Sequence, residues 1–260
     1  MIPAREIKEH AREYGVPPST IERDYAQNWL LASLSRLPMA LKGGTGIRKV
    51  YIENYRFSDD LDFTLLEAVN KDELQAAVQD AVTRVREESG ILFEEEIGII
   101  KTMSGYRATA KFRILHSSAT TPINIDLDLT DPDNEQVFLP VQVRKIFHHY
   151  SDTLDASITC YALEEIMAEK IRSLFQRTRS RDLYDIWQLA DRVNRQDVKS
   201  VLQMKCEAKS VTVDHAILTG KHDQFKAAWD VSLHHQMQDV PDFDEAFDKM
   251  TDEIERYEYQ

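Results

Sequence analysis

Two short stretches of this chain carry residues whose types and spacing could handle phosphate and metal ions. The first is a turn made of Gly43, Gly44 and Thr45, and the second is an acidic run that contains Asp60 and Asp62. Glycines let the backbone approach a phosphate closely, and threonine adds a hydroxyl. Because residues two apart in a strand share a face, the two aspartates would point into the same small volume.

Two carboxylates held that close repel each other unless a cation neutralises them. A hard divalent ion such as Mg²⁺ prefers oxygen ligands and keeps positions open for phosphate oxygens. A third carboxylate from a neighbouring strand would complete the site; Asp126 is the candidate, and Asp128 on the same face is its rival. We therefore predict a metal site of Asp60, Asp62 and Asp126 that holds Mg²⁺, with two ions expected.

The glycine turn differs from two common nucleotide-binding motifs. No Gly-Lys-Ser or Gly-Lys-Thr follows it at the spacing of a P-loop, and the chain has no GxGxxG dinucleotide fingerprint. Any phosphate site at this turn is therefore of a different type.

Strands must position these residues in the first half of the chain. Five apolar or alternating runs predict them: residues 39–44, 61–65, 91–100, 106–115 and 121–129. On the polar face of 106–115 lie Arg107, Lys111 and Arg113, which are either solvated or in contact with an RNA backbone.

Helices are expected on both sides of this strand-rich region. Two precede residue 37, and Ser19 or Thr20 is the expected N-cap of the second. Asn70 and Glu73 fit a capping box that starts a further helix, and Gly90 is a natural stop for it.

From about residue 161 the pattern becomes helical. Apolar residues recur there at helical spacing: Leu163, Ile166, Met167, Ile171 and Leu174. The predicted fold class is α/β (α+β), with a mixed sheet and flanking helices in residues 1–150. Residues 151–260 are predicted to form a helical C-terminal domain.

Composition limits the possible partners and the compartment. The net charge is -13, so any contact with nucleic acid must be local, through a basic patch or a metal. Cys160 and Cys206 fit no zinc or disulfide framework and suit a reducing compartment. Without a secretory signal or an apolar run that could span a bilayer, we expect a cytoplasmic protein that needs no membrane.

A longer match extends these local patterns. The stretches "RDYAQNWLLASL", "LKGGTGIRKVY", "RFSDDLDFTL" and "EEIMAEKIRSLFQRTRSRDLYDIWQL" follow one another in this order. This order resembles that of the AbiEii/AbiGii nucleotidyltransferase toxin family, within the DNA polymerase β-like nucleotidyltransferase superfamily. The resemblance runs from about Tyr14 to Leu189, and the remaining stretch of the chain resembles nothing familiar.

The resemblance implies a function. The family belongs to bacterial type IV toxin–antitoxin and abortive-infection systems, and it is described as binding nucleoside triphosphates. Some members transfer nucleotides to RNA, including tRNA acceptor ends. For this chain, that implies an NTP substrate, an RNA acceptor such as tRNA, and a cognate antitoxin encoded nearby.

The resemblance also implies roles for individual residues. The implied catalytic residues are Asp60, Asp62, Asp126, Lys170 and Asp182. The implied nucleotide-binding residues are Gly43, Gly44, Thr45, Ser58, Lys170, Arg181 and Asp185. The implied metal ligands are Asp60, Asp62 and Asp126.

Some alternatives stay open. Lys170 either extends to water as a structural lysine or donates to a triphosphate oxygen. Either Asp182 caps the helix and Asp185 pairs with Arg181 or Arg192, or one of the two acids holds Lys170 or an incoming hydroxyl. The same fold could also serve as a non-catalytic nucleotide- or partner-binding module, or transfer nucleotides to a protein or small molecule.

Overall fold

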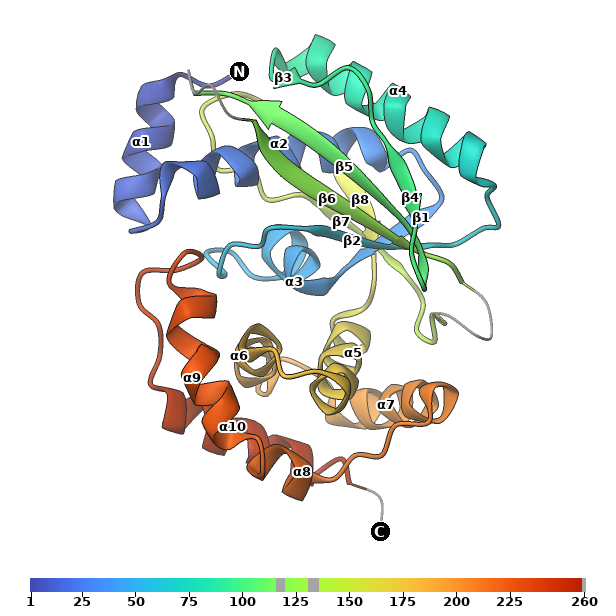
Figure 1. Ribbon diagram of the computed structural model, residues 1–260, viewed down its shortest axis with the longest axis vertical. Helices are drawn as coiled ribbons and strands as arrows, with labels where there is room; N and C mark the ends of the chain where they lie inside the picture. Colours follow the sequence, from blue (N-terminus) through green and yellow to red (C-terminus); the bar gives the residue numbers. More distant parts are fainter. Residues whose placement is uncertain (116–119, 131–135, 259–260) are drawn as a thin grey trace. The chain divides into compact units, whose positions relative to one another are not determined.

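The computed structural model describes residues 1–115, 120–130 and 136–258. Contacts divide the chain into two compact units. One comprises Met1–Gln136 with Val141–Tyr161, and the other comprises Val137–Pro140 with Ala162–Gln260. The first is built on a sheet, and the second is helical (Figure 1).

The first unit is organised around an eight-stranded mixed sheet with the order β3-β5-β6-β2-β1-β8-β7, in which β4 also pairs with β5. The strands are β1 (Met39–Lys42), β2 (Leu61–Leu65), β3 (Leu92–Phe93), β4 (Ile99–Lys101), β5 (Gly105–Arg113), β6 (Thr121–Asp128), β7 (Gln142–Lys145) and β8 (Ser157–Cys160). The pairs β2–β6 and β1–β8 are parallel, and the other pairs are antiparallel. Strand β8 lies after the domain boundary predicted at residue 150, and that boundary stays a prediction.

The predicted alternation of β5 and β6 determines which of their residues enter the core. The buried residues are Ala108, Ala110, Phe112, Ile123, Ile125 and Leu127. Two helices, α2 (Pro18–Leu34) and α4 (Lys71–Ser89), pack against each other and against these strands (Figure 1). The charged residues of β5 and β6 are therefore left on the opposite face of the sheet.

A close backbone approach sets the register of β5 against β6. Gly105 lies opposite Asp128 at the start of β5. A Cβ atom at Gly105 would lie 2.1 Å from the carbonyl oxygen of Leu127, a separation that no side chain tolerates. Glycine is therefore required at this position.

The ends of the N-terminal helices partly follow the sequence signals. Asn70 accepts a hydrogen bond from the Glu73 N–H at 2.9 Å, and Gly90 ends α4 with a φ of 72°. The Asn70 N-cap and the glycine stop are thus confirmed, and the return bond of the Glu73 side chain that would complete a capping box stays a prediction. The helix that precedes α2 is α1 (Ala4–Glu13).

The N-cap predicted for α2 is wrong. Pro17 occupies the N-cap, Pro18 opens the first turn, and no side chain caps the helix. Proline suits the first helical position because its fixed φ is already helical and its missing N–H needs no partner there. Ser19 and Thr20 are therefore displaced into the first turn.

The second unit contains six helices in its described part: α5 (Leu163–Gln176), α6 (Ser180–Leu189), α7 (Arg195–Lys209), α8 (His215–Thr219), α9 (His222–Leu233) and α10 (Phe243–Glu255). The buried Lys205 lies 3.0 Å from Glu165 of α5. Glu165 also accepts hydrogen bonds from the N–H groups of Phe138 and Leu139, which fixes residues 137–140 to this unit. Among the described residues, no helix has the length and apolar character needed to cross a membrane.

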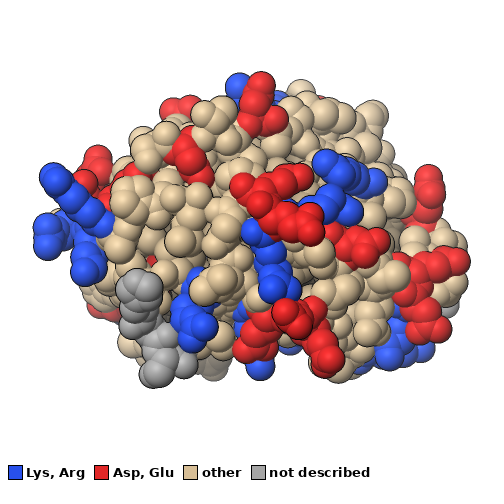
Figure 2. Space-filling model, turned by 90° about the horizontal axis from the view of Figure 1, so that it is seen from above, with Lys and Arg blue, Asp and Glu red and all other residues tan. Residues whose placement is uncertain are grey.

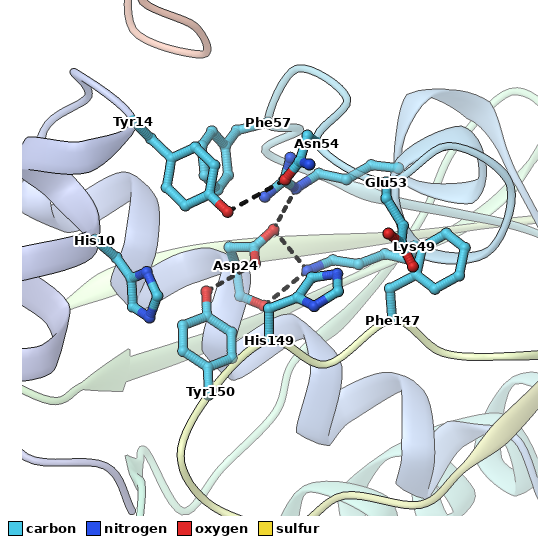
Figure 3. A pocket seen from close by; sticks show the side chains of 11 residues that line it. His10, Tyr14, Asp24, Lys49, Glu53, Asn54, Phe57, Phe147, His149 and Tyr150 are labelled. Carbon is cyan, nitrogen blue, oxygen red and sulfur yellow. Dashed lines mark hydrogen bonds and ion pairs between the residues drawn. The ribbon is translucent and has the colours of Figure 1, made fainter.

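A buried ion cluster fixes the backbone that follows the glycine turn (Figure 3). After α3 (Gly43–Gly46) comes a π-helical segment, η1 (Ile47–Tyr51). Asp24 of α2 lies 2.6 Å from both Arg48 and Lys49 of η1, and Tyr150 donates to it at 2.8 Å. Burial would raise the pKa of Asp24, but the two adjacent cations hold it well below its usual range.

We expect the stability of the protein to rise with pH through the titration of Lys49. Burial lowers the pKa of Lys49 to about 8, despite the neighbouring Asp24, whereas an unfolded lysine has a pKa of about 10.4. Between these values the unfolded chain binds more protons, so the unfolding free energy rises by up to about 1.4 kcal/mol per pH unit. Urea unfolding at about pH 7.5 and 9.5 should show this rise in the wild type.

The variant Lys49→Met should lack this component. The control is Lys145→Met, since Lys145 is 69% exposed and should leave the rise unchanged. An equal rise in wild type and Lys49→Met would contradict the assignment.

Candidate functional site

Four charged side chains form one row across the sheet. Lys42 of β1 pairs in register with Asp62 of β2, Asp62 with Asp126 of β6, and Asp126 with Arg107 of β5. Residues directly opposite on paired strands project to the same face. Asp62 and Asp126 therefore lie side by side in the middle of the row, with the basic residues Lys42 and Arg107 at its ends.

Asp60, the residue before β2, lies on the same face. The side-chain amide of Asn124 donates to its Oδ1 at 3.0 Å. Asn124 and Asp126 are two apart on β6 and share a face. The structure thus brings Asp60, Asp62 and Asp126 to one side of the sheet.

Arg107 binds both oxygens of Asp126. Its Nε lies 2.5 Å from Oδ1 and its Nη2 lies 2.9 Å from Oδ2, in a bidentate arrangement. These hydrogen bonds and the charge of Asp126 raise the pKa of Arg107, and the charges of Asp60 and Asp62 raise it further. The guanidinium therefore lies within the electrostatic field of all three acids.

The rival acid, Asp128, lies farther along β6. It pairs in register with Thr64 rather than with Asp62. Its oxygens contact the Lys42 ammonium at 2.9 Å and the Ser104 hydroxyl at 2.5 Å. Of the two, Asp126 is the acid placed directly beside Asp62.

The glycine turn lies against the acidic strand. Gly43 has a φ of 67°, and a Cβ atom there would lie 2.4 Å from Oδ2 of Asp62. A Cβ atom at Gly44 would lie 2.8 Å from the Arg56 guanidinium and 3.3 Å from the Ser58 hydroxyl. The backbone of the turn therefore approaches a carboxylate, a guanidinium and a hydroxyl as closely as only glycine permits.

Thr45 ties this turn to the acids. It is fully buried, and its hydroxyl donates to the carbonyl oxygen of Asp60 at 2.5 Å. A phosphate contact by this hydroxyl, which the family resemblance implies, would require it to leave Asp60. The loop before β2 is held from α2, where Gln27 donates to the carbonyl oxygens of Ser58 and Asp59 at 3.0 and 3.1 Å.

A second charged cluster lies within the helical unit. The Lys170 ammonium is 2.7 Å from Asp182 and 2.9 Å from Asp185, and Arg177 is 3.1 Å from Asp182. Burial would raise the pKa of Asp182, but the charges of Lys170 and Arg177 lower it overall. Both acids thus hold Lys170, and α6 begins without a side-chain cap. Arg181, in the first turn of α6, is half-buried.

The acids of the sheet suit a hard cation. Their carboxylate oxygens share one face beside a turn so tight that a Cβ atom would strike Asp62. Hard divalent ions select this kind of oxygen donor. Asp60, Asp62 and Asp126 would hold such an ion.

Another group of potential metal ligands, more closely spaced than the acids of the sheet, lies elsewhere in the chain. Across the part of the chain that the structure describes, only Asp214, His215 and Glu258 bring three potential ligand atoms within 4.8 Å of one another. Asp214 caps α8, and Glu258 accepts hydrogen bonds from the backbone and ring of His215. Local hydrogen bonding is sufficient to explain this group.

Several residues of the site were not predicted from the sequence. Lys42 and Asn124 were not among the predicted site residues, Arg56 was matched only as part of the motif before the acidic strand, and Arg107 was expected to be solvated or bound to RNA. Each takes its place from strand register or from a loop contact. The adjacency of two alternating runs, 106–115 and 121–129, is the one signal that could have paired Arg107 with Asp126.

Two solved structures share this fold. MenT4, a nucleotidyltransferase toxin from Mycobacterium tuberculosis, is 18% identical with a TM-score of 0.66, covering 98% of this chain and 89% of that one. JHP933 from Helicobacter pylori is 19% identical with a TM-score of 0.61, covering 93% of each chain. No curated protein sequence matches this chain. The predicted fold class, a mixed sheet with flanking helices and a helical C-terminal part, is confirmed.

The family is shown by sequence. Residues 27–249 match the family described as nucleotidyl transferase AbiEii toxin of the type IV toxin–antitoxin system. This match includes the glycine turn, the acids of the sheet and the Lys170 cluster. It also continues well past residue 189, where the predicted resemblance ended. The chain belongs to the AbiEii family of nucleotidyltransferase toxins, and it is a nucleotidyltransferase.

Proposed function

We propose that this toxin transfers a nucleotide from an NTP to an RNA acceptor, with tRNA as the acceptor class, in a reaction that depends on Mg²⁺. The observation that supports this most directly is the pairing of Asp62 with Asp126 beside the glycine turn. Acids on one face supply metal ligands, and the turn offers backbone to a triphosphate.

The acids have distinct tasks in this proposal. Asp60, Asp62 and Asp126 would supply carboxylate oxygens to divalent ions, which would lower the pKa of the acceptor hydroxyl. As that hydroxyl bonds to the α-phosphorus, the bond to the β-phosphate breaks, and the same ions would neutralise charge on the leaving pyrophosphate. Asp126, once free of Arg107, could accept the proton of that hydroxyl.

The glycine turn would bind the β- and γ-phosphates. A helix leaves its first N–H groups without intrahelical acceptors, and α3 begins at Gly43. Gly44 brings this backbone close to Ser58, whose hydroxyl would add a hydrogen bond. Thr45 contributes by holding the turn against Asp60.

Lys170 and Arg181 of the helical unit are also proposed as nucleotide-binding residues, as the family resemblance implies. Lys170 is oriented by two buried carboxylates, Asp182 at 2.7 Å and Asp185 at 2.9 Å. Its role would be to balance negative charge on the triphosphate, with Asp182 and Asp185 as positioning residues. Arg181 would add a second nucleotide contact.

RNA must be bound locally in this proposal. The net charge is -13, and Figure 2 shows acidic and basic side chains interspersed on the displayed face. A broad electrostatic coat for RNA is not visible on that face. We place the reaction in the cytoplasm, which suits two free cysteines, and expect the cognate antitoxin to be encoded nearby.

Incubation with each labelled NTP, Mg²⁺ and total tRNA tests the function. We expect the wild type to transfer label to RNA. The transfer rate should fall by about 10²- to 10⁴-fold in Asp62→Asn and Asp126→Asn, because each removes a metal ligand. Asp128→Asn should lose far less, since Lys42 and Ser104 already engage that carboxylate.

Several outcomes would count against this assignment. If Asp62→Asn keeps its transfer activity, the acids have no role in the mechanism. If Asp128→Asn loses more transfer activity than Asp126→Asn, the third acid is Asp128. Absence of label on RNA, with label on a protein or small molecule, would change the acceptor class.

Gly43→Ala tests the turn. The new Cβ atom would meet Asp62 at 2.4 Å, and alanine disfavours a φ of 67° by about 1–2 kcal/mol. We expect a lower melting temperature and a large fall in transfer activity. Gly98→Ala is the matched control, because nothing lies within 4 Å of its Cβ position. Equal behaviour of the two variants would argue against a tight turn at Asp62.

Lys170→Met tests the cluster of the helical unit. Losing the ammonium leaves Asp185 buried without this partner, which should destabilise the protein by about 3 kcal/mol. Asp182 has a lowered pKa, so its ion pairs stabilise the fold above the usual carboxyl pKa and lose this effect as the pH falls through the folded-state value. The difference in unfolding free energy between Lys170→Met and the wild type should therefore become smaller as the pH falls.

The double variant Lys170→Met with Asp185→Asn should recover part of that stability, since it also removes the buried charge. Unfolding in urea measures stability, and calorimetry on the folded variants measures NTP affinity. Unchanged NTP affinity in Lys170→Met would separate the cluster from nucleotide binding.

A further inference from the structure

Arg107 already supplies the positive charge that the acids require. Closely spaced carboxylates need a cation to neutralise them. In the structure, that cation for Asp126 is a side chain of the adjacent strand, bound through two contacts of 2.5 and 2.9 Å. Asp126 can therefore lie beside Asp62 without a bound metal ion.

The same contacts obstruct Asp126 as a metal ligand. A guanidinium fork uses both carboxylate oxygens on the side that faces it. A divalent ion on one of those oxygens would lie only a few ångströms from the guanidinium, and like charges at that separation repel strongly. Asp126 cannot serve both cations equally well.

Arg107 has room to move away. Its side chain is 45% exposed, compared with 24% for Asp126. Its other cross-strand neighbour is Ile100 of β4, which is 62% exposed. The guanidinium can therefore leave Asp126 without disturbing packed core residues.

We propose that Arg107 is an internal counter-cation that competes with the divalent ion for Asp126, so that metal binding releases Arg107 from the row. This inference rests on the proposed metal role of the acids. Because binding and release are linked, the pair lowers the apparent metal affinity, and removing Arg107 raises it. The enzyme then holds its metal most firmly when a nucleotide supplies additional ligands.

Mn²⁺ titration followed by electron paramagnetic resonance, without nucleotide, tests this proposal. We expect Arg107→Gln to bind Mn²⁺ about 3- to 10-fold more tightly than wild type, the effect of removing one partly exposed bidentate competitor. Arg107→Lys keeps the charge but loses the fork, so it should fall between the two.

The matched control is Lys111→Gln. Lys111 is on the same strand and the same face as Arg107, but it contacts Glu94 at 3.5 Å rather than the acids of the sheet. The same change of charge there should leave Mn²⁺ affinity unaltered. An equal gain in both variants, or no gain in Arg107→Gln, would overturn the proposal.

Asp62→Asn separates this inference from the proposed function. If Asp62→Asn loses Mn²⁺ binding while Arg107→Gln behaves as wild type, the competition is refuted and the metal site stands. If Asp62→Asn binds Mn²⁺ as wild type does, the metal role of the acids fails, and the inference fails with it.

Nuclear magnetic resonance provides a readout on the wild type, should Arg107→Gln not fold. The Nε–H signal of Arg107, assigned by its loss in Arg107→Lys, should shift when Mg²⁺ is added. In Asp62→Asn it should stay in place at the same Mg²⁺ concentration. A signal that Mg²⁺ leaves unmoved in the wild type would also overturn the proposal.

Discussion

The parallel pairing of β2 with β6 is the interaction on which the candidate site depends. It places Asp62 beside Asp126, and a slip of one residue would send one of them to the apolar face. The register is maintained from that other face, where Ile123 and Ile125 are fully buried. The hydrophobic core thus holds two like charges together, and the favourable burial of apolar residues offsets their repulsion.

Helix α2 also holds two segments next to the site, η1 and the loop before β2. Its buried Asp24 anchors η1 behind the glycine turn, and its Gln27 holds the loop before β2. One largely buried helix therefore packs on the sheet and holds the chain on both sides of the stretch from the glycine turn to β2. Other buried polar residues of α2 bond elsewhere: Glu22 accepts from the Leu115 N–H, Asn28 donates to the carbonyl oxygen of Phe147, and Ser33 donates to that of Ala81.

Local signals in the sequence predict what local physics determines. The glycine turn, the acidic strand, the Asn70 N-cap and the apolar stripe of α5 depend on neighbouring residues, so the sequence predicts them directly. The pairing of Arg107 with Asp126 depends on the register between strands, which no single stretch encodes. The cap of α2 was missed because two prolines outweighed the hydroxyl residues that follow them. Likewise, β8 joins the sheet through a partner, Leu41, that is distant in sequence.

Gly105 has no side chain of its own, but its position affects the charged residues of the neighbouring strands. Its missing side chain lets β5 approach the carbonyl oxygen of Leu127, and this contact begins the ladder in which Arg107 meets Asp126. A methyl group there would force the hairpin apart at its base and disturb the pairing of Arg107 with Asp126. Mutational tolerance at this glycine is therefore a measure of how strictly the sheet depends on this register.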